Sequence, residues 1–203
     1  MSANKWIVVS ILSIAGIAPA FAQSENTEKN EVSVQAFGSF VKSTIDNGID
    51  NAATNSGGVL STYRYFFNAH HGVEANYGYA LNTQNYGLNG GLAGGPLGVN
   101  SYSHEVSAAY VFRVPMRNFT PFVLAGAGGL IFDPKDFIGA GSQARAAFVY
   151  GGGADFNLSH HLFLRAEYRG FVYNSPTYDL PTLAGVDRVT HRAEPSIGFG
   201  YRF

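Results

Sequence analysis

The chain has 203 residues, no cysteine and a formal net charge of −1 at pH 7. Charged residues make up 13% of the chain, about half the ~25% of a typical soluble domain, whereas 25 glycines and 14% aromatic residues are high shares. Without cysteine there is no disulfide scaffold and no thiolate metal site. Near-neutral charge with so few lysines argues against nucleic-acid binding. The composition therefore indicates a folded chain with an unusually small charged surface.

The first 22 residues have the three-part layout of a secretory signal peptide. Lys5 precedes an apolar run over residues 7–18, and small residues then lead to Gln23. The apolar run is shorter than the ~20 residues of a membrane helix, although an N-terminal anchor is the alternative. We expect a cleaved signal peptide over residues 1–22, a flexible polar leader over 23–30 and one domain over 31–203.

Beyond the leader the apolar residues alternate with polar ones, and no later apolar run is long enough for a membrane helix. Eight stretches with this period-two pattern are bounded by turn residues, which indicates an all-β fold. The stretches are residues 31–41, 58–66, 72–81, 104–113, 121–132, 146–156, 162–173 and 189–203.

The connections between these stretches alternate in length. Short connections follow the second, fourth and sixth stretches, and long ones rich in Gly, Asn, Pro and Ser follow the others. The long connections are residues 42–57, 82–103, 133–145 and 174–188. This layout predicts an eight-stranded antiparallel up-and-down transmembrane β-barrel, with short periplasmic turns and long extracellular loops.

The strand stretches have one apolar and one polar face. In residues 162–173, for example, Leu162 and Leu164 share a face, opposite Arg165 and Glu167. Sorted in this way, the polar faces of the eight stretches carry arginines and carboxylates in nearly equal numbers and no lysine. We expect a lumen charge network of Arg64, Glu74, Glu105, Asp155, Arg165, Glu167, Arg169, Arg192, Glu194 and Arg202.

Alternation alone does not decide which face points inward. A secreted, lipocalin-like binding barrel has apolar residues inside, whereas a membrane barrel has them outside. Arginine without lysine suits fixed, partly buried bidentate pairs with carboxylates. Small residues on the same face suit the narrow interior of eight strands, and aromatic residues near strand ends suit a membrane girdle. These features favour the membrane barrel over the soluble one.

Several segments resemble a known family. The final alternation of Phe199, Tyr201 and Phe203, together with residues 63–79 and 121–129, is similar to eight-stranded outer-membrane barrels of the OmpA-transmembrane-domain, OmpX and OmpW type. The resemblance implies location in the bacterial outer membrane, among its lipids and lipopolysaccharide. It also implies that the last three aromatic residues are a signal for the barrel assembly machinery. Pro195 departs from the pattern and predicts a bulge or a frayed site in the last strand.

Few residues have side chains suited to catalysis or metal binding. The pairs His70–His71 and His160–His161 lie in short turns, where adjacent side chains diverge rather than share a metal. Ser103, His104 and Glu105 suggest a lipid-A-modifying enzyme, but neighbours on a strand point to opposite faces and do not converge. We therefore expect no catalytic residues, no metal site and no cofactor.

The expected role is structural or directed at surface interactions, with a small pore or a lipid-A-modifying enzyme as alternatives. Within the lumen we expect Arg64 to pair with Glu74, and Arg165 or Arg169 to pair with Glu167, Asp155 or Glu194. These pairs would fill the lumen and block conduction through it. We expect no nucleic-acid partner, and a surface ligand would bind at the long loops. The loop residues that would meet it are Asp46, Asp50, Asp133, Asp136, Asp179, Asp187, Tyr86, Tyr102, Phe137 and Tyr178.

Overall fold

The computed structural model contains ten β-strands in the residues that it describes. These residues are 28–42, 44–46, 49–53, 56–88, 97–134, 142–174 and 189–203. The strands are β1 (Asn30–Val41), β2 (Thr44–Asp46), β3 (Ile49–Ala53), β4 (Ser56–Phe66), β5 (His71–Leu88), β6 (Leu97–Arg113), β7 (Phe119–Pro134), β8 (Gln143–Asn157), β9 (Leu162–Asn174) and β10 (Val189–Arg202). The expected signal peptide lies outside the described residues.

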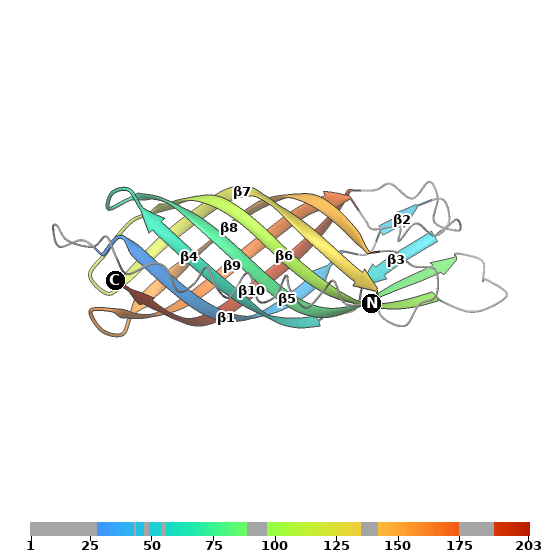
Figure 1. Ribbon diagram of the computed structural model, residues 1–203, viewed down its shortest axis with the longest axis horizontal. Helices are drawn as coiled ribbons and strands as arrows, with labels where there is room; N and C mark the ends of the chain where they lie inside the picture. The colour runs from blue at the N-terminus through green and yellow to red at the C-terminus, as the bar shows by residue number, and fades with distance from the viewer. Residues whose placement is uncertain are drawn as a thin grey trace, which may run out of the picture.

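Eight of the strands close into a barrel, as the alternation and the connection lengths predict. From β4 to β10 each strand pairs antiparallel with the next one in the chain, and β1 closes the ring by pairing with both β4 and β10. Figure 1 shows the strands crossing the long axis obliquely. No helix in the described part of the chain is long and apolar enough to span a membrane.

One end of the barrel, here called the turn end, is formed by three short turns. They join β4 to β5, β6 to β7 and β8 to β9. In the first turn the Asn68 side chain accepts hydrogen bonds from the backbone N–H groups of His70 and His71, both at 2.9 Å, a local bond that favours a tight turn. Asn30 and Phe203 exchange backbone hydrogen bonds of 3.1 and 2.9 Å at the same end. The opposite end is the loop end.

The loop end contains more β-structure than the sequence predicts. The expected long loop over residues 82–103 is wrong, because β5 and β6 continue as a ladder as far as the pair Tyr86–Leu97. The expected loop over residues 42–57 contains β2 and β3, and β3 pairs with the tip of β5. These segments lack an apolar face, so their period-two pattern is weak, yet backbone pairing needs no apolar side chains. In Figure 1 they extend beyond the barrel.

The buried face of the barrel strands is the polar one. Along β5, Gly72, Glu74 and Asn76 are buried, whereas Val73 is exposed. Large apolar side chains cover the outside of the molecule, for example Phe199, which is 64% exposed, and Val34, which is 59% exposed. This is the reverse of a soluble barrel and matches a barrel surrounded by lipid.

Pro195 interrupts one ladder without a bulge. Between β1 and β10, Phe37 pairs with Ser196 and Phe40 with Ala193, so the register is unchanged, but the two intervening residue pairs are missing. The ladder between β10 and β9 continues through the pair Pro195–Tyr168. Proline has no N–H to donate, so pairing is lost locally while no residue is inserted. Of the two alternatives predicted at Pro195, the bulge is therefore wrong. The local loss of pairing between β1 and β10 is the frayed site.

Candidate functional site: the charged lumen

The ten residues of the expected charge network all come from inward-facing strand positions. Four of the arginines, Arg64, Arg165, Arg169 and Arg192, are among the largest fully buried side chains of the described residues. Arg202, near the turn end, has a side chain that is 12% exposed. Burial of this many charges is stable only with close partners, and the pairs fall into three layers along the lumen.

The layer at the turn end is organised by Glu31. Its carboxylate accepts hydrogen bonds from Arg113 at 2.6 Å and from Arg165 and Arg202, both at 2.9 Å. Arg165 also donates to both oxygens of Asp155, at 2.7 and 2.8 Å, which is a bidentate pair.

Glu31 and Arg113 were not among the ten network residues expected from the sequence. Arg113 lies on the polar face of its stretch, but at the very end of it. Glu31 is the first residue of its stretch, where the alternation has only begun. The alternation of Ser33 and Gln35 with Val32 and Val34 is the signal that places Glu31 inside.

The middle layer is built on a cross-strand pair of β4 and β5. Arg64 and Glu74 are direct partners in the ladder, and Arg64 Nε donates to Glu74 at 2.7 Å. The same guanidinium donates to Glu167 of β9 at 3.1 Å, across the lumen. Asn76 donates to the other oxygen of Glu74 at 2.7 Å. Arg64 therefore joins opposite walls of the barrel.

The layer nearest the loop end contains two arginines and two carboxylates. Arg169 donates to Glu105 at 2.6 Å and lies 3.5 Å from Glu167, which connects this layer with the middle one. Arg192 forms an ion pair with Glu194 and donates to Ser103 Oγ at 2.9 Å. Of the partners expected for Arg165 and Arg169, Asp155 and Glu167 are found in these roles, and the salt-bridge partner of Glu194 is Arg192.

Aromatic rings fill the space between the charges. The guanidinium of Arg64 lies 4.0 Å from the centre of the Phe122 ring, and that of Arg165 lies 5.3 Å from the same ring. Arg113 lies 3.4 Å from the Phe66 ring. Cations over ring faces gain electrostatic stabilisation while water is excluded. The Phe122 ring thus contacts guanidinium groups of both the turn-end and the middle layer.

The residues of the enzyme hypothesis do not converge. Ser103 and Glu105 are buried in the lumen, where they contact Arg192 and Arg169. His104 faces outward and shares a hydrogen bond of 2.9 Å with the Tyr77 hydroxyl. A nucleophile, its base and an orienting group must lie within hydrogen-bond reach, and here the barrel wall separates them.

The turn histidines have protein partners at the turn end. His71 shares a hydrogen bond with the Tyr110 hydroxyl, and His161 lies 2.6 Å from the Glu28 carboxylate. In the described part of the chain, no three side chains of the ligating types gather closely enough to hold a metal ion.

The aromatic residues of the expected assembly signal lie on the outer face of β10 and just beyond it. Phe199 and Tyr201 are exposed and Phe203 is half-buried. Tyr201 stacks on His161 with ring centres 5.4 Å apart, and on Phe203 at 6.3 Å. Tyr63, Tyr65 and other exposed aromatic side chains lie near the turn end as well, as in the interfacial girdle of a membrane barrel.

The closed ring of eight strands, the apolar exterior and the charged interior together define a transmembrane β-barrel. The chain belongs to the outer membrane protein beta-barrel domain family, whose model matches residues 8–203. The resemblance to eight-stranded outer-membrane barrels is thereby confirmed, and the protein is located in the bacterial outer membrane. In such barrels the short turns face the periplasm, so the turn end is the periplasmic end.

Solved structures of the same architecture cover most of the chain. The outer membrane protein OprG from Pseudomonas aeruginosa is 18% identical, with 87% of this chain and 96% of that chain covered and a TM-score of 0.60. Ail, the attachment invasion locus protein of Yersinia pestis, is 23% identical over 87% and 100%, with a TM-score of 0.54. Neisserial surface protein A is 13% identical over 86% and 97%, with a TM-score of 0.56. Comparison with curated protein sequences finds no match.

Proposed function

We propose that this protein is a closed outer-membrane barrel with a structural or surface-interaction role, and that its lumen conducts no ions. The observation that carries this proposal is the set of ion pairs that crosses the lumen in three layers. Arg64 bridges β4 to β9, and Arg169 bridges β9 to β6, each with a side chain at most 1% exposed. An ion entering the lumen would have to separate these buried pairs, which is costly in a low-dielectric interior.

Recordings in planar lipid bilayers test the closed lumen. The wild-type barrel is expected to show no steady unit conductance. A variant that combines Arg64→Ala with Glu74→Ala removes one bridge across the lumen and is expected to show small conductance steps. Phe148→Ala, at an outward position that is 56% exposed, serves as the control and is expected to behave like the wild type. Steady single-channel conductance of the wild type would establish the alternative, a small pore.

The surface-interaction part of the proposal is supported by the small sheet beyond the rim. There β2, β3, β5 and β6 pair in that order, and the sheet carries Asp46 and Asp50. Asp133 and Tyr102 lie nearby on the loop-end parts of β7 and β6. Asp136, Phe137, Tyr178, Asp179 and Asp187 lie outside the described residues. Strands that project from a rigid barrel beyond its rim suit recognition of a surface partner.

A shortened hairpin tests this part of the proposal. Replacing residues 85–98 by an Asn-Gly turn removes the tips of β5 and β6 and leaves the barrel ladders intact. If the sheet serves surface interaction, cells carrying the shortened protein should adhere to epithelial or abiotic surfaces less than cells carrying equal amounts of the full chain. Equal adhesion would favour a purely structural role.

The same proposal includes the partners expected for an outer-membrane barrel, namely membrane lipids, lipopolysaccharide and the assembly machinery. It does not include enzymatic activity, because Ser103 and Glu105 are separated from His104 by the barrel wall. Mass analysis of lipid A from cells with and without the protein is expected to show identical acylation. A changed acylation pattern would overturn this part of the proposal.

A further inference from the structure

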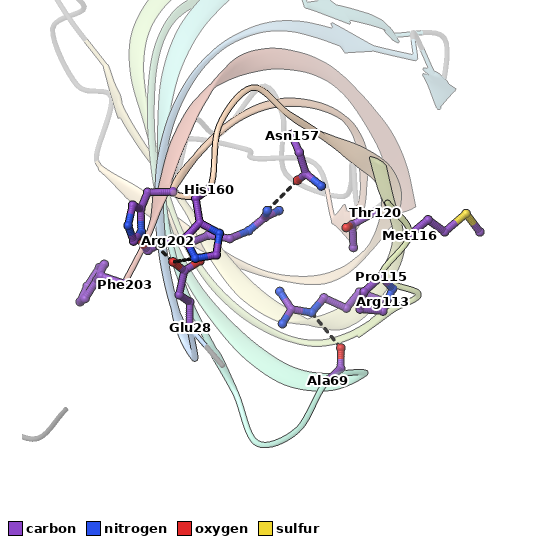
Figure 2. Close-up of a pocket in the computed structure, with 11 residues that line it drawn as sticks. Glu28, Ala69, Arg113, Pro115, Met116, Thr120, Asn157, His160, Arg202 and Phe203 are labelled. Carbon is purple, nitrogen blue, oxygen red and sulfur yellow. Dashed lines mark hydrogen bonds and ion pairs between the residues drawn. The ribbon is translucent and has the colours of Figure 1, made fainter. Parts of the chain in front are cut away.

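The cations at the two ends of the barrel differ in their partners. In the cavity at the periplasmic end, shown in Figure 2, Arg202 donates to the Asn157 side chain at 2.7 Å and Arg113 donates to the Ala69 carbonyl at 3.0 Å. Lys42 follows β1 at the loop end. Its side chain is exposed, and its ammonium group has no carboxylate partner among the described residues. This ammonium group is therefore available to an anion from the surroundings of the protein.

Lys42 lies opposite His191 on the outer surface. Its backbone N–H donates to the His191 carbonyl at 3.0 Å, which continues the register in which Val41 pairs with Arg192. Arg192 is buried in the lumen, so its neighbour His191 and the opposite residue Lys42 point outward. Cross-strand neighbours have Cβ atoms about 4.5–5.5 Å apart, close enough for two side chains to bind one group. The Thr190 hydroxyl donates to the Lys42 carbonyl at 3.2 Å and fixes the backbone there.

Tyr150 adds a third group to this pair. It comes from β8, and its ring lies over Gly170 of β9, where an added Cβ would be 2.6 Å from a ring atom. Its hydroxyl thereby reaches β10 and shares a hydrogen bond of 2.8 Å with His191 Nε2. Whichever group donates in this bond, one donor remains, either the Nδ1–H of the imidazole or the O–H of the phenol. Lys42, His191 and Tyr150, here called the rim cluster, therefore offer an ammonium group and a further donor.

The rim cluster lies at the level of the lipid headgroups. His191 precedes Arg202, at the turn end of β10, by eleven residues. At about 3.3 Å per residue and a strand tilt of about 40°, His191 lies about 28 Å from the turn end along the barrel axis. The apolar band of such barrels is about 25 Å tall, so the cluster lies at its outer border. On the hydrocarbon side of the cluster, Phe40 of β1 is 45% exposed and offers an apolar surface to acyl chains.

We propose that the rim cluster binds the phosphate group of an outer-leaflet lipid, such as a phosphate of the lipid A part of lipopolysaccharide. A phosphate supplies both the negative charge for Lys42 and acceptors for the free donor of the Tyr150–His191 pair. A lipid also places its acyl chains against Phe40, a contact that free phosphate lacks. This proposal deepens the lipid partner included in the proposed function. It rests on the outer-membrane location and not on the closed lumen, so conductance of the barrel would leave it unaffected.

The lipid phosphate is tested with the full barrel in micelles of dodecyl maltoside, an uncharged detergent without phosphate. Dihexanoylphosphatidic acid is the probe, dihexanoylglycerol is its match without the phosphate, and inorganic phosphate is the free anion. Backbone NMR signals of Lys42, Tyr150 and His191 are expected to shift saturably with the probe, to remain unchanged with dihexanoylglycerol and to respond more weakly to inorganic phosphate. Equal shifts with dihexanoylglycerol, equal or tighter binding of inorganic phosphate, or no saturable shift would each overturn the proposal.

The role of Lys42 is tested without touching the ion pairs of the lumen. Lys42→Gln removes the ammonium group and is expected to weaken binding of dihexanoylphosphatidic acid by about tenfold. Lys29→Gln makes the same change of charge at an exposed lysine near the turn end and is the matched control. Lys42→Arg keeps the charge and is expected to retain binding. Equal weakening in the two glutamine variants would mean general attraction rather than a site, and unchanged binding by Lys42→Gln would contradict the proposal.

The role of His191 is tested by His191→Phe, which keeps an aromatic ring but removes the imidazole nitrogens. His104→Phe is the matched control, because His104 also faces outward near the loop end and shares a hydrogen bond of 2.9 Å with a tyrosine hydroxyl, that of Tyr77. His191→Phe is expected to weaken binding of the probe by about threefold or more, and His104→Phe to leave it unchanged. Equal affinities of the two variants would contradict recognition by His191. The heat-dependent gel shift checks that both fold, and should His191→Phe not fold, the comparison of Lys42→Gln with Lys29→Gln decides the proposal.

Discussion

Arg64 illustrates what a charged side chain requires inside this barrel. It donates to Glu74 on the neighbouring strand and to Glu167 across the lumen, and the Phe122 ring lies 4.0 Å from its guanidinium. Each contact compensates for part of the hydration that the buried cation has lost. The arrangement is stable only as a set, because a single missing carboxylate leaves a charge without its partner.

Removal of one member of this set is expected to be costly. Glu74→Ala should lower the free energy of unfolding by about 3 kcal/mol, because Arg64 stays buried with one carboxylate fewer. The single tryptophan is Trp6, inside the expected signal peptide, so the folded fraction is better followed by the heat-dependent gel shift across a urea series. A double variant, Arg64→Met with Glu74→Leu, should regain much of the loss. An unchanged midpoint for Glu74→Ala would mean that water reaches Arg64 and that the lumen is open.

Two glycines of β7 differ sharply in the space around them. A Cβ at Gly126 would overlap the backbone of Ala108 and Ala109 on β6, whereas a Cβ at Gly129 would have nothing within 4 Å. Gly126→Ala is therefore expected to destabilise the barrel by about 1–3 kcal/mol, as overpacking does. Gly129→Ala is expected to be neutral or slightly stabilising, because alanine reduces the freedom of the unfolded chain. Urea midpoints of the two variants give the comparison, and equal midpoints would contradict it.

At the scale of strands, the sequence predicts the parts that the membrane constrains. Within the bilayer a strand must alternate between lipid and lumen, so period two identifies all eight barrel strands and places Glu74 and Arg165 inside. Outside the bilayer this constraint ends. The tips of β5 and β6 and the hairpin of β2 and β3 are held by backbone pairing, which polar residues satisfy equally well. Composition there indicates a loop, and the pairing is visible only in three dimensions.

The charge network shows the same division. The period-two alternation predicts which arginines and carboxylates face the lumen. The pairing of Arg64 with Glu74 also follows from the sequence, because a short turn joins their strands and sets the register. The contacts of Arg169 with Glu105 and of Arg165 with Glu31 join strands that are not neighbours. Such contacts depend on how the ring closes and on the tilt of its strands, which no local pattern specifies.

The last strand supports a prediction about assembly. If Phe199, Tyr201 and Phe203 are read by the assembly machinery, Phe203→Ser should lower the amount of folded protein in the outer membrane of living cells several-fold. Phe156→Ser changes another exposed aromatic residue near the turn end, on β8, and is the matched control. Both purified variants should refold similarly in detergent, since neither residue is in the lumen. Equal membrane levels of the two variants in cells would argue against a special role of the last strand.

At the scale of the whole molecule, the low charge content has a physical explanation. The outward positions of the barrel strands face hydrocarbon, where a charge is unfavourable, so most charges are confined to the lumen and to the segments beyond the bilayer. Inside, arginine predominates over lysine because one guanidinium can bind two carboxylates, as Arg64 and Arg165 do. The abundance of glycine has a related cause, since Gly126 and others let neighbouring strands approach where a side chain would collide.

This inverted organisation can be tested at a single outward position. Val34 of β1 is 59% exposed and pairs with Ser61 on one side and Phe199 on the other. In lipid vesicles Val34→Arg should lower the free energy of unfolding by about 2–4 kcal/mol, because the cation must enter the bilayer or distort it. Val34→Leu keeps the surface apolar and should change little. On a barrel surrounded by water the arginine would be nearly neutral, so an unchanged unfolding free energy in vesicles would show that this face of β1 does not contact hydrocarbon.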